Sequence, residues 1–319
     1  MTIPAVELYL QHYPDHKITY VVEEKFKGIG ELIPGIHELK VIPKDMPLKE
    51  IYRFRKEMRA KNFQIAVDFH SGPKSALLTF LSGAQTRIGY RTPNRNWAYN
   101  RLTPRNQAGE FTHSVFNQIK LLEHVGIGTD SLPPYPEIRI EAEDVQPELK
   151  LWLHDSKQNQ PVAAIHVGAG NRFRDWGIDR FEELVDRLSK AGVELALIGH
   201  SPEEREKGAL LSRRFGAMDW TGRLSIRETL YLIQESDVYF GVDSGPLHLA
   251  SLTQTPIVAI YGPNIPAVSG PWRRDNVDLI QLDMKCRPCS QRSCVYDTIR
   301  CMRDIKAETI YEAIIRYIK

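Results

Sequence analysis

The chain has 319 residues and a net charge of +2 at pH 7, with 42% hydrophobic and 26% charged residues. This composition is that of an ordinary globular protein, and the length favours two domains over one hydrophobic core. The small net charge, without a basic run interleaved with aromatic residues, argues against a nucleic-acid partner. The sequence has neither an apolar stretch of the roughly 18 residues that a transmembrane segment needs nor a signal peptide. We therefore expect a cytoplasmic protein.

The first half alternates short apolar or β-branched runs with helical patterns, which is typical of βαβ units on a parallel sheet. Strands are predicted at KITYVVEE (17–24), LKVIP (39–43), QIAVDFH (64–70) and TRIGYR (86–91). Helices are predicted at 47–62, 73–84 and 110–127, the last ending near Gly126. The Pro- and Arg-rich stretch 91–107 is interpreted as a loop, and the Pro- and acid-rich stretch 131–150 as a linker.

The second half repeats this alternation more clearly. Strands are predicted at 161–170, which ends in a glycine loop, and at 193–200, 237–243 and 256–262. Helices are predicted at 178–192, 201–216, 225–236, 244–252 and 306–319. The predicted fold class is therefore α/β, with two Rossmann-like domains, 1–145 and 146–319, and a cleft between them. The final helix is a candidate to pack back on the first domain.

Three loops that follow predicted strands point to a phosphate-bearing ligand: HVGAG (166–170), GHSP (199–202) and VDSG (242–245). Ligands of open α/β sheets bind beyond the carboxyl ends of strands, and helix N-termini favour anions. Ser244 and Gly245 are candidates for a close approach to an anion, and Asp243 for orienting the loop or a sugar hydroxyl. His248 would face the same site. Alternatively, Asp243 caps the helix and His248 is a core residue.

Charged residues near two of these loops fit the same ligand. Arg172 and Arg174, in NRFRDW, are candidates to clamp a leaving diphosphate, because guanidinium groups suit phosphate geometry. The alternative is a solvated basic turn. Glu203 and Glu204, after the GHS turn, could accept hydrogen bonds from ribose hydroxyls, or could simply complement the dipole of the helix that they begin.

The four cysteines lie in one short segment, CRPCSQRSCVYDTIRC (286–301). Its C-x2-C start suits tetrahedral metal ligation, but the remaining spacing matches no standard zinc finger. One hypothesis is therefore a structural zinc at Cys286, Cys289, Cys294 and Cys301, and the other is buried or reversibly oxidised thiols. A cytosolic setting argues against a permanent disulfide.

The segment VDSGPLHLASLTQTPIVAIYGPNIPAVSGPW (242–272) resembles the signature of glycosyltransferase family 9, the ADP-heptose:lipopolysaccharide heptosyltransferases. CRPCSQRSCVYDTIRCMRDI (286–305) is similar to a cysteine-bearing segment of many members, and HVGAGNRFRDWGIDRFEEL (166–184) to the family's glycine loop and following helix. VDFHSGPKSALLTFLSGAQTRIGYR (67–91) and THSVFNQIKLLEHVGI (112–127) also resemble family segments. The resemblance covers nearly the whole chain.

The resemblance implies a GT-B fold, with the acceptor held mainly by the first domain and the sugar nucleotide by the second. It implies an inverting enzyme that moves a heptose from ADP-heptose to the lipopolysaccharide inner core, without a metal or other cofactor for catalysis. Glu204 would then lie near the ribose and Leu224 near the adenine. Arg174 stands where the family usually has Lys, which puts the detail of diphosphate contact in doubt. The full set of implied donor-binding residues is Gly168, Arg174, Glu204, Leu224, Asp243, Ser244, Gly245 and His248.

The family's proposed general base is an Asp in a Gly-Asp loop after the first strand. Here MTIP (1–4) aligns just after that loop, so we expect the strand and the base to be missing, either by truncation or by a real loss of catalysis. The catalytic residue is thus unknown, and Asp68 and His70 are weak substitutes. Two alternative functions stay open: a related glycosyltransferase with another nucleotide-sugar donor, and a non-catalytic sugar-nucleotide-binding protein.

Basic residues of the first half are candidates to meet the anionic lipid A–core acceptor, with Lys74 and Arg91 as the nominated pair. The alternative is that they are solubilising surface charge. The implied place of action is the inner face of the inner membrane, with at most peripheral attachment because no transmembrane segment is predicted.

Overall fold

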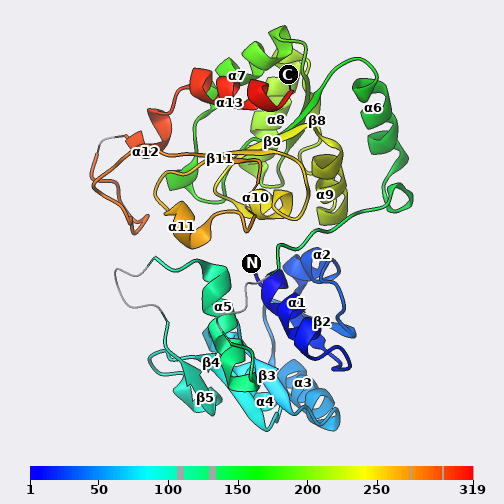
Figure 1. Ribbon diagram of the computed structural model, residues 1–319, viewed down its shortest axis with the longest axis vertical. Coiled ribbons are helices and arrows are strands. Elements are labelled where there is room, and N and C mark those ends of the chain that lie inside the picture. Colours follow the sequence, from blue (N-terminus) through cyan, green and yellow to red (C-terminus); the bar gives the residue numbers. More distant parts are fainter. Residues whose placement is uncertain (106–110, 129–133, 274, 297, 319) are drawn as a thin grey trace. The chain divides into compact units, whose positions relative to one another are not determined.

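The computed structural model describes residues 1–105, 111–128, 134–273, 275–296 and 298–318. The chain divides into two compact units, 1–136 and 137–319 (Figure 1). The boundary lies before the predicted one at 145/146 because the intervening segment packs on the second unit. The backbone N–H of Ile138 donates to the carbonyl of Leu252 (2.8 Å), and that of Ile140 to the side chain of Gln234 (2.8 Å).

The first unit contains two parallel sheets, with strand orders β1-β2 and β3-β4-β5. Its strands are β1 (Thr19–Glu23), β2 (Glu38–Ile42), β3 (Ile65–Val67), β4 (Thr86–Tyr90) and β5 (Arg101–Thr103). Its α-helices are α1 (Ile3–His12), α2 (Lys27–Gly30), α3 (Leu48–Ala60), α4 (Pro73–Leu81) and α5 (Ser114–Leu122). The apolar stripe of α3 explains its packing, since Phe54 and Met58 join Ile42 of β2 and Leu78 of α4 in one buried cluster.

The parallel strands and the main helices of this unit confirm the predicted alternation, with three differences. Helices α1 and α2 were not predicted, and β5 lies inside the predicted loop 91–107. The helix predicted at 110–127 is confirmed at 114–122. Positions 106–107 of the predicted loop, Glu110 of the predicted helix and positions 131–133 of the predicted linker lie outside the described residues.

The second unit is built on one six-stranded parallel sheet, with order β8-β7-β6-β9-β10-β11. Its strands are β6 (Val162–His166), β7 (Glu194–Ile198), β8 (Met218–Asp219), β9 (Val238–Val242), β10 (Ile257–Ile260) and β11 (Val277–Ile280). Its helices are α6 (Pro147–Lys157), α7 (Ile178–Lys190), α8 (Pro202–Phe215), α9 (Ile226–Glu235), α10 (Gly245–Ala250), α11 (Pro266–Ser269), α12 (Arg300–Arg303) and α13 (Ala307–Ile318). In chain order these strands read 3-2-1-4-5-6, the Rossmann arrangement.

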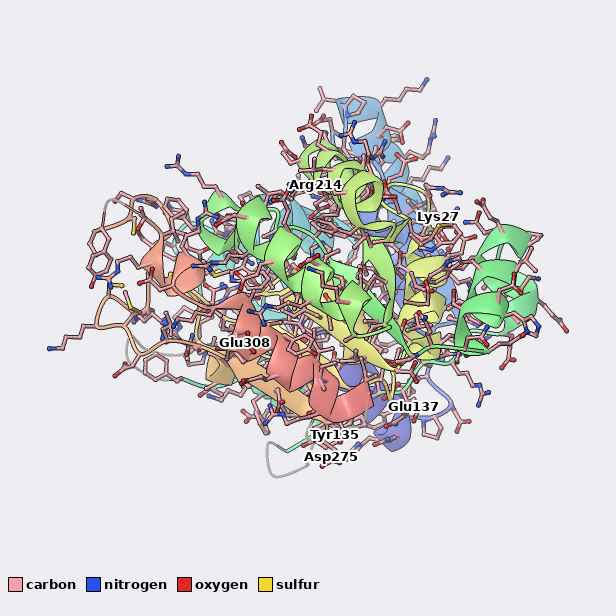
Figure 2. All side chains as sticks on the ribbon, turned by 90° about the horizontal axis from the view of Figure 1, so that it is seen from above. Lys27, Tyr135, Glu137, Arg214, Asp275 and Glu308 are labelled. Atoms are coloured by element: carbon pink, nitrogen blue, oxygen red, sulfur yellow. The ribbon has the colours of Figure 1, made fainter. Side chains whose placement is uncertain are left out.

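Helices cover both faces of this sheet (Figure 1). On one face α7 packs beside α13 and α8, and on the other α9 and α10 pack together near β9. Side chains of α7 ion-pair with both of its neighbours: Glu182 with Arg214 of α8, and Arg187 with Glu308 of α13; Figure 2 labels Arg214 and Glu308. The final helix is confirmed at 307–318 and lies in the second unit's core, while its packing on the first domain stays a prediction. Lys319, its predicted last residue, lies outside the described residues.

The core between the sheet and α7 is aromatic. Trp176 meets Phe181 and Phe240 edge-on, with ring centroids 5.2 and 5.4 Å apart, and all three side chains are fully buried. Such pairs add about 0.5–1.5 kcal/mol each beyond the area that they bury. This packing holds the strand ends that carry the candidate site. Among the described residues, no helix is long and apolar enough to cross a membrane.

Candidate functional site

Strands β6 and β9 are neighbours in the second unit's sheet, although the chain leaves them in opposite directions, from β6 to β7 and from β9 to β10. Such a topological switch point is where open α/β sheets bind ligands. The loop after β6 carries Gly168 and Arg174, and the loop after β9 carries Asp243 and Ser244. The fold therefore brings together predicted site residues that are far apart in the sequence.

Asp243 is a buried acid, only 3% exposed, and is held by two other loops. Arg174 donates from Nη1 to the Asp243 carbonyl (3.0 Å), and the same nitrogen lies 3.6 Å from Oδ2 of the carboxylate. Asn264 donates to Oδ2 as well. Burial raises the pKa of Asp243, while the Asn264 hydrogen bond and the Arg174 charge oppose that rise. Asp243 is thus in direct contact with Arg174, the predicted diphosphate clamp.

A second predicted role of Asp243, capping of the following helix, is wrong. The N-cap of α10 is Ser244, and it makes no side-chain capping hydrogen bond. The Ser244 hydroxyl is instead turned back toward the sheet, where it donates to the Val242 carbonyl (3.0 Å) and lies 3.1 Å from Nδ1 of His166. The Asp243 carboxylate is instead buried in contact with Asn264 and Arg174.

The chain of contacts from Ser244 continues through His166 to Glu204. His166 Nε2 lies 3.1 Å from Glu204 Oε1, and Glu204 Oε2 accepts from the N–H groups of His200 (2.6 Å) and Ser201 (2.8 Å). Burial raises the pKa of Glu204, but the hydrogen bond and charge of His166 and the two N–H groups outweigh it and lower the pKa to about 2. Glu204 therefore completes a capping box with Ser201 at the start of α8.

This placement favours the structural interpretation of Glu204, because both of its oxygens already accept hydrogen bonds from the protein. Its contact with a ribose stays a prediction. Gly168 is part of the same arrangement, since a Cβ placed on it would lie 2.8 Å from Glu204 Oε1. The glycine allows the carboxylate to lie against the loop after β6. His166 was predicted only as the first residue of this loop, and its contacts with Glu204 and Ser244 were not predicted.

The remaining predicted donor residues lie after two strands of this sheet, Leu224 after β8 and the other two after β9. Gly245 is exposed, and among the described residues no heavy atom other than its chain neighbours and the backbone of its own helix would lie within 4 Å of a Cβ placed there. His248 lies in α10, partly buried, and its carbonyl accepts from Ser251 Oγ (2.8 Å). Leu224 is half-buried between β8 and α9, directly before the α9 cap Ser225. The roles of all three stay predictions.

Two amides that the sequence analysis did not nominate complete the surroundings of Arg174. Gln291 accepts at Oε1 from Arg174 Nε (3.1 Å) and donates from Nε2 to Oδ1 of Asn264 (2.7 Å). Asn264 lies inside the family-like segment 242–272, and Gln291 lies inside the cysteine-bearing segment. Membership of these segments is the one sequence signal from which a role of either residue in the site could have been predicted.

The four cysteines of the cysteine-bearing segment all lie among the described residues. All four cysteines are free, with Cys301 buried and the other three partly exposed. Burial raises the pKa of the Cys301 thiol. Among the described residues, no group of three or more His, Cys, Asp or Glu side chains is arranged to hold a metal ion. The structural zinc hypothesis and the thiol hypothesis both stay predictions.

The predicted acceptor-side pair lies in the first unit. Lys74 donates to Glu23 Oε1 (3.0 Å) and to the carbonyls of Pro43 (2.6 Å) and Lys44 (2.8 Å), which uses all three ammonium protons within the unit. Arg91 is exposed at the end of β4. Arg91 is thus the more available of the two for an acceptor, and both contacts stay predictions.

The two weak base candidates differ in availability. Asp68 is 5% exposed, and its carboxylate accepts from the N–H groups of His70 (2.9 Å) and Ser71 (2.8 Å) and from the Tyr99 hydroxyl (2.7 Å). These contacts order the turn after β3 and leave the carboxylate little access to an acceptor hydroxyl. His70 is exposed, and its base role stays a prediction.

Comparison with known proteins agrees with this architecture. The model of glycosyltransferase family 9 (heptosyltransferase) matches residues 51–300. The chain belongs to this family. Lipooligosaccharide heptosyltransferase 2 of Campylobacter jejuni is 36% identical over 306 residues, which cover 92% of this chain and 90% of the relative. Lipopolysaccharide heptosyltransferase 3 of Escherichia coli K12 is 25% identical over 289 residues, or 85% and 81% of the two chains.

Solved structures show the same fold. The E. coli ADP-heptose lipopolysaccharide heptosyltransferase II superposes with a TM-score of 0.80 at 19% identity, covering 99% of this chain and 94% of that one. The E. coli heptosyltransferase WaaC with ADP-2-deoxy-2-fluoro heptose superposes with a TM-score of 0.73, also at 19% identity, covering 99% and 94%. The resemblance, the GT-B fold and the class of enzyme, a glycosyltransferase, are thereby confirmed.

Proposed function

We propose that this family 9 glycosyltransferase moves a heptose from ADP-heptose to the lipopolysaccharide inner core with inversion at the anomeric carbon. The observation that carries the proposal is the pairing of Arg174 with the Asp243–Ser244 turn at the switch point of the sheet. Support for the donor comes from the names of the relatives, which are heptosyltransferases, and from the fold neighbour that holds an ADP-heptose analogue.

Arg174 is suited to a diphosphate because its guanidinium is held but not covered. Nε donates to Gln291 and Nη1 to Asp243, while 28% of the side chain remains exposed. At Gly170 and Gly245 an added Cβ would meet no described heavy atom within 4 Å, apart from chain neighbours and the backbone of the α10 helix. This open space lets the backbone approach a ligand closely. A held cation beside open backbone matches the geometry that a leaving nucleoside diphosphate requires.

In the proposed reaction an acceptor hydroxyl attacks the anomeric carbon while the bond from that carbon to the diphosphate oxygen breaks. The hydroxyl proton passes to a base, which this chain leaves unassigned, and the bonding electron pair leaves with ADP. Arg174 stabilises the charge that grows on the departing diphosphate, and Asp243 and Ser244 orient the donor. No step of this proposed reaction requires a metal.

We infer that the cytoplasmic enzyme binds its lipid A–core acceptor at the inner face of the membrane, through peripheral contact with the bilayer. Phe80 and Trp97 form an exposed edge-on pair, with ring centroids 5.4 Å apart, and the Arg87 guanidinium lies 5.7 Å from the Phe80 ring. Aromatic side chains beside a cation suit the polar region of an anionic bilayer.

The first test is calorimetric titration with ADP, UDP and GDP, followed by turnover of ADP-heptose with a heptose-free lipid A–core acceptor. We expect selective binding of ADP, weakened about tenfold or more by Asp243→Ala, because the carboxylate that lies 3.6 Å from Arg174 Nη1 and accepts from Asn264 is lost. Asp237→Ala is the matched control, since Asp237 lies at the opposite end of β9 and accepts from Val162 N (2.7 Å).

Each other outcome selects an alternative function. A preference for UDP or GDP would replace the donor and indicate a related glycosyltransferase. ADP binding without turnover would indicate a non-catalytic sugar-nucleotide-binding protein. Loss of binding in Asp237→Ala as great as in Asp243→Ala would show that the effect comes from the strand and not from the site.

A second prediction concerns two glycines, Gly168 and Gly245, at which an added methyl group would have different surroundings. Gly168→Ala is expected to destabilise the protein by about 1–3 kcal/mol, because the new Cβ overlaps the buried Glu204 side chain. Gly245→Ala is expected to change stability by less than about 0.5 kcal/mol, yet to weaken ADP binding because it fills the space that the ligand approaches. Thermal unfolding and calorimetry measure the two effects; a stable Gly168→Ala protein or full ADP affinity in Gly245→Ala would contradict them.

A further inference from the structure

Four residues from four separate segments close a ring of hydrogen bonds at the candidate donor site. Arg174 donates from Nε to Oε1 of Gln291 (3.1 Å), and Gln291 donates from Nε2 to Oδ1 of Asn264 (2.7 Å). Asn264 donates from Nδ2 to Oδ2 of Asp243. Arg174 Nη1 closes the ring on the Asp243 carbonyl (3.0 Å). The loops after β6, β9 and β10 and the cysteine-bearing segment each supply one member.

The Arg174 guanidinium determines which group donates and which accepts in each hydrogen bond of the ring. A guanidinium can only donate, so the group that faces Arg174 Nε must be the carbonyl oxygen of the Gln291 amide. Asn171 donates to the same oxygen (2.9 Å), which reinforces this orientation. The Gln291 NH2 group must then face Asn264, whose own NH2 group is thereby turned toward Asp243. The orientation of one amide therefore determines which group the buried carboxylate meets.

Gln291 also has an uncommon backbone conformation. Its φ is +56°, in the left-handed region that residues other than glycine rarely adopt. Its N–H donates to Cys289 Sγ (3.4 Å), within the same segment. A strained backbone persists where the surrounding structure holds it, and here the strain places an amide in reach of three other loops.

We propose that Gln291 is a positioning residue of the donor site, which fixes the Arg174 guanidinium directly and the Asp243 carboxylate through Asn264. This inference rests on the proposed function, because the ring matters for turnover only if the donor binds there. It also assigns the cysteine-bearing segment a part in the site, as the segment that carries the amide.

The ring predicts how the carboxylate titrates. Charged and titratable groups near Asp243 are Arg174, from the loop after β6, and Tyr261, at the end of β10, whose pKa is raised first by burial and then by Asp243. His166 approaches the adjacent Ser244. Burial raises the pKa of Asp243, and the Asn264 hydrogen bond opposes it. Without Gln291 to orient Asn264, the pKa should rise further, so the ionised form would be lost at a higher pH as the pH falls.

The experiment compares Gln291→Leu with Gln281→Leu. Gln281 donates to the backbone carbonyl of Asn264 (2.8 Å), so the control removes a hydrogen bond to the same loop without entering the ring. We expect Gln291→Leu to weaken ADP binding about tenfold, the size of one lost charge-assisted hydrogen bond, and to shift the acid limb of kcat/KM to higher pH. Gln281→Leu should leave both unchanged.

Gln291→Glu separates the two halves of the ring. It keeps an acceptor for Arg174 and Asn171 but cannot donate to Asn264. ADP affinity should therefore stay within about threefold of the parent protein, while the titration of Asp243 moves to higher pH. Carbon-13 NMR of labelled aspartate carboxyls in the nucleotide-free protein, with the Asp243 signal assigned by Asp243→Asn, reads this shift without any ligand.

The outcomes distinguish the inference from the proposed function. If the parent protein does not bind ADP but its Asp243 titration still shifts in Gln291→Leu, the ring exists and the proposed function fails. If the parent binds ADP and Gln291→Leu matches Gln281→Leu in affinity, pH profile and Asp243 titration, Gln291 has no positioning role. Equal loss of folding in both leucine variants, with a normal Asp243 titration in Gln291→Glu, would also overturn the inference.

Discussion

Arg174→Ala is expected to lower kcat/KM for the sugar-nucleotide donor by about 10²–10³-fold, the usual effect of removing one preorganised group that stabilises transition-state charge. The reason is geometric. The Arg174 guanidinium is held by Gln291 and by the Asp243 carbonyl, so it needs no reorganisation when charge develops on the leaving diphosphate. Steady-state kinetics with ADP-heptose, with product ADP as the readout, measures the loss.

Arg172→Ala is the matched control, because Arg172 is exposed two residues away and its guanidinium lies over the Phe173 ring, 4.8 Å from the centroid. We expect it to retain activity within about threefold, since a solvated surface charge contributes little. Arg174→Lys should recover part of the loss, because it keeps the charge but not the fork that spans Gln291 and Asp243. Equal losses in Arg172→Ala and Arg174→Ala would show a general effect of positive charge and not a clamp.

Glu204→Gln is expected to lower the free energy of unfolding by about 3 kcal/mol at pH 7, the value of a pKa lowered from 4.5 to about 2. The lowered pKa means that the folded state favours the ionised carboxylate, through His166 and the two N–H groups that it accepts. This contribution is complete above about pH 5 and is lost as the pH falls toward the folded-state pKa. Urea unfolding of both proteins between pH 7 and pH 3 measures the difference.

Glu203→Gln provides the comparison for this prediction. Glu203 is the neighbouring acid in the first turn of α8 and is exposed, so its substitution should change stability by less than about 0.5 kcal/mol. A difference between Glu204→Gln and the parent that does not shrink at low pH would rule out the ionised capping box as its cause. A loss of ADP affinity larger than the loss of stability would instead support the predicted ribose contact.

Much of the fold was predictable because the relevant signals are local. The apolar alternation of the second half specified strands such as β6 and β9, and Ser201, Pro202 and Glu204 at the start of α8 form a recognisable capping sequence. Helix α1 was missed because Pro4 and Pro14 flank a segment with a weak helical pattern, although its Ile3, Val6 and Leu8 are buried. Strand β5 was missed because three residues inside a Pro- and Arg-rich stretch carry too little periodicity.

The sequence by itself determined the class of fold, the family and the loops that carry the candidate site, because each depends on residues that are contiguous or regularly spaced. Only the tertiary structure decided how those loops combine. Asp243 meets Arg174 and Asn264 instead of capping a helix, and Glu204 turns to His166. The switch point in the strand order brings these segments together, and burial then makes each polar group take a partner. A contact that depends only on proximity in space, such as that of Gln291 with Arg174, produces no recognisable spacing of residues in the sequence.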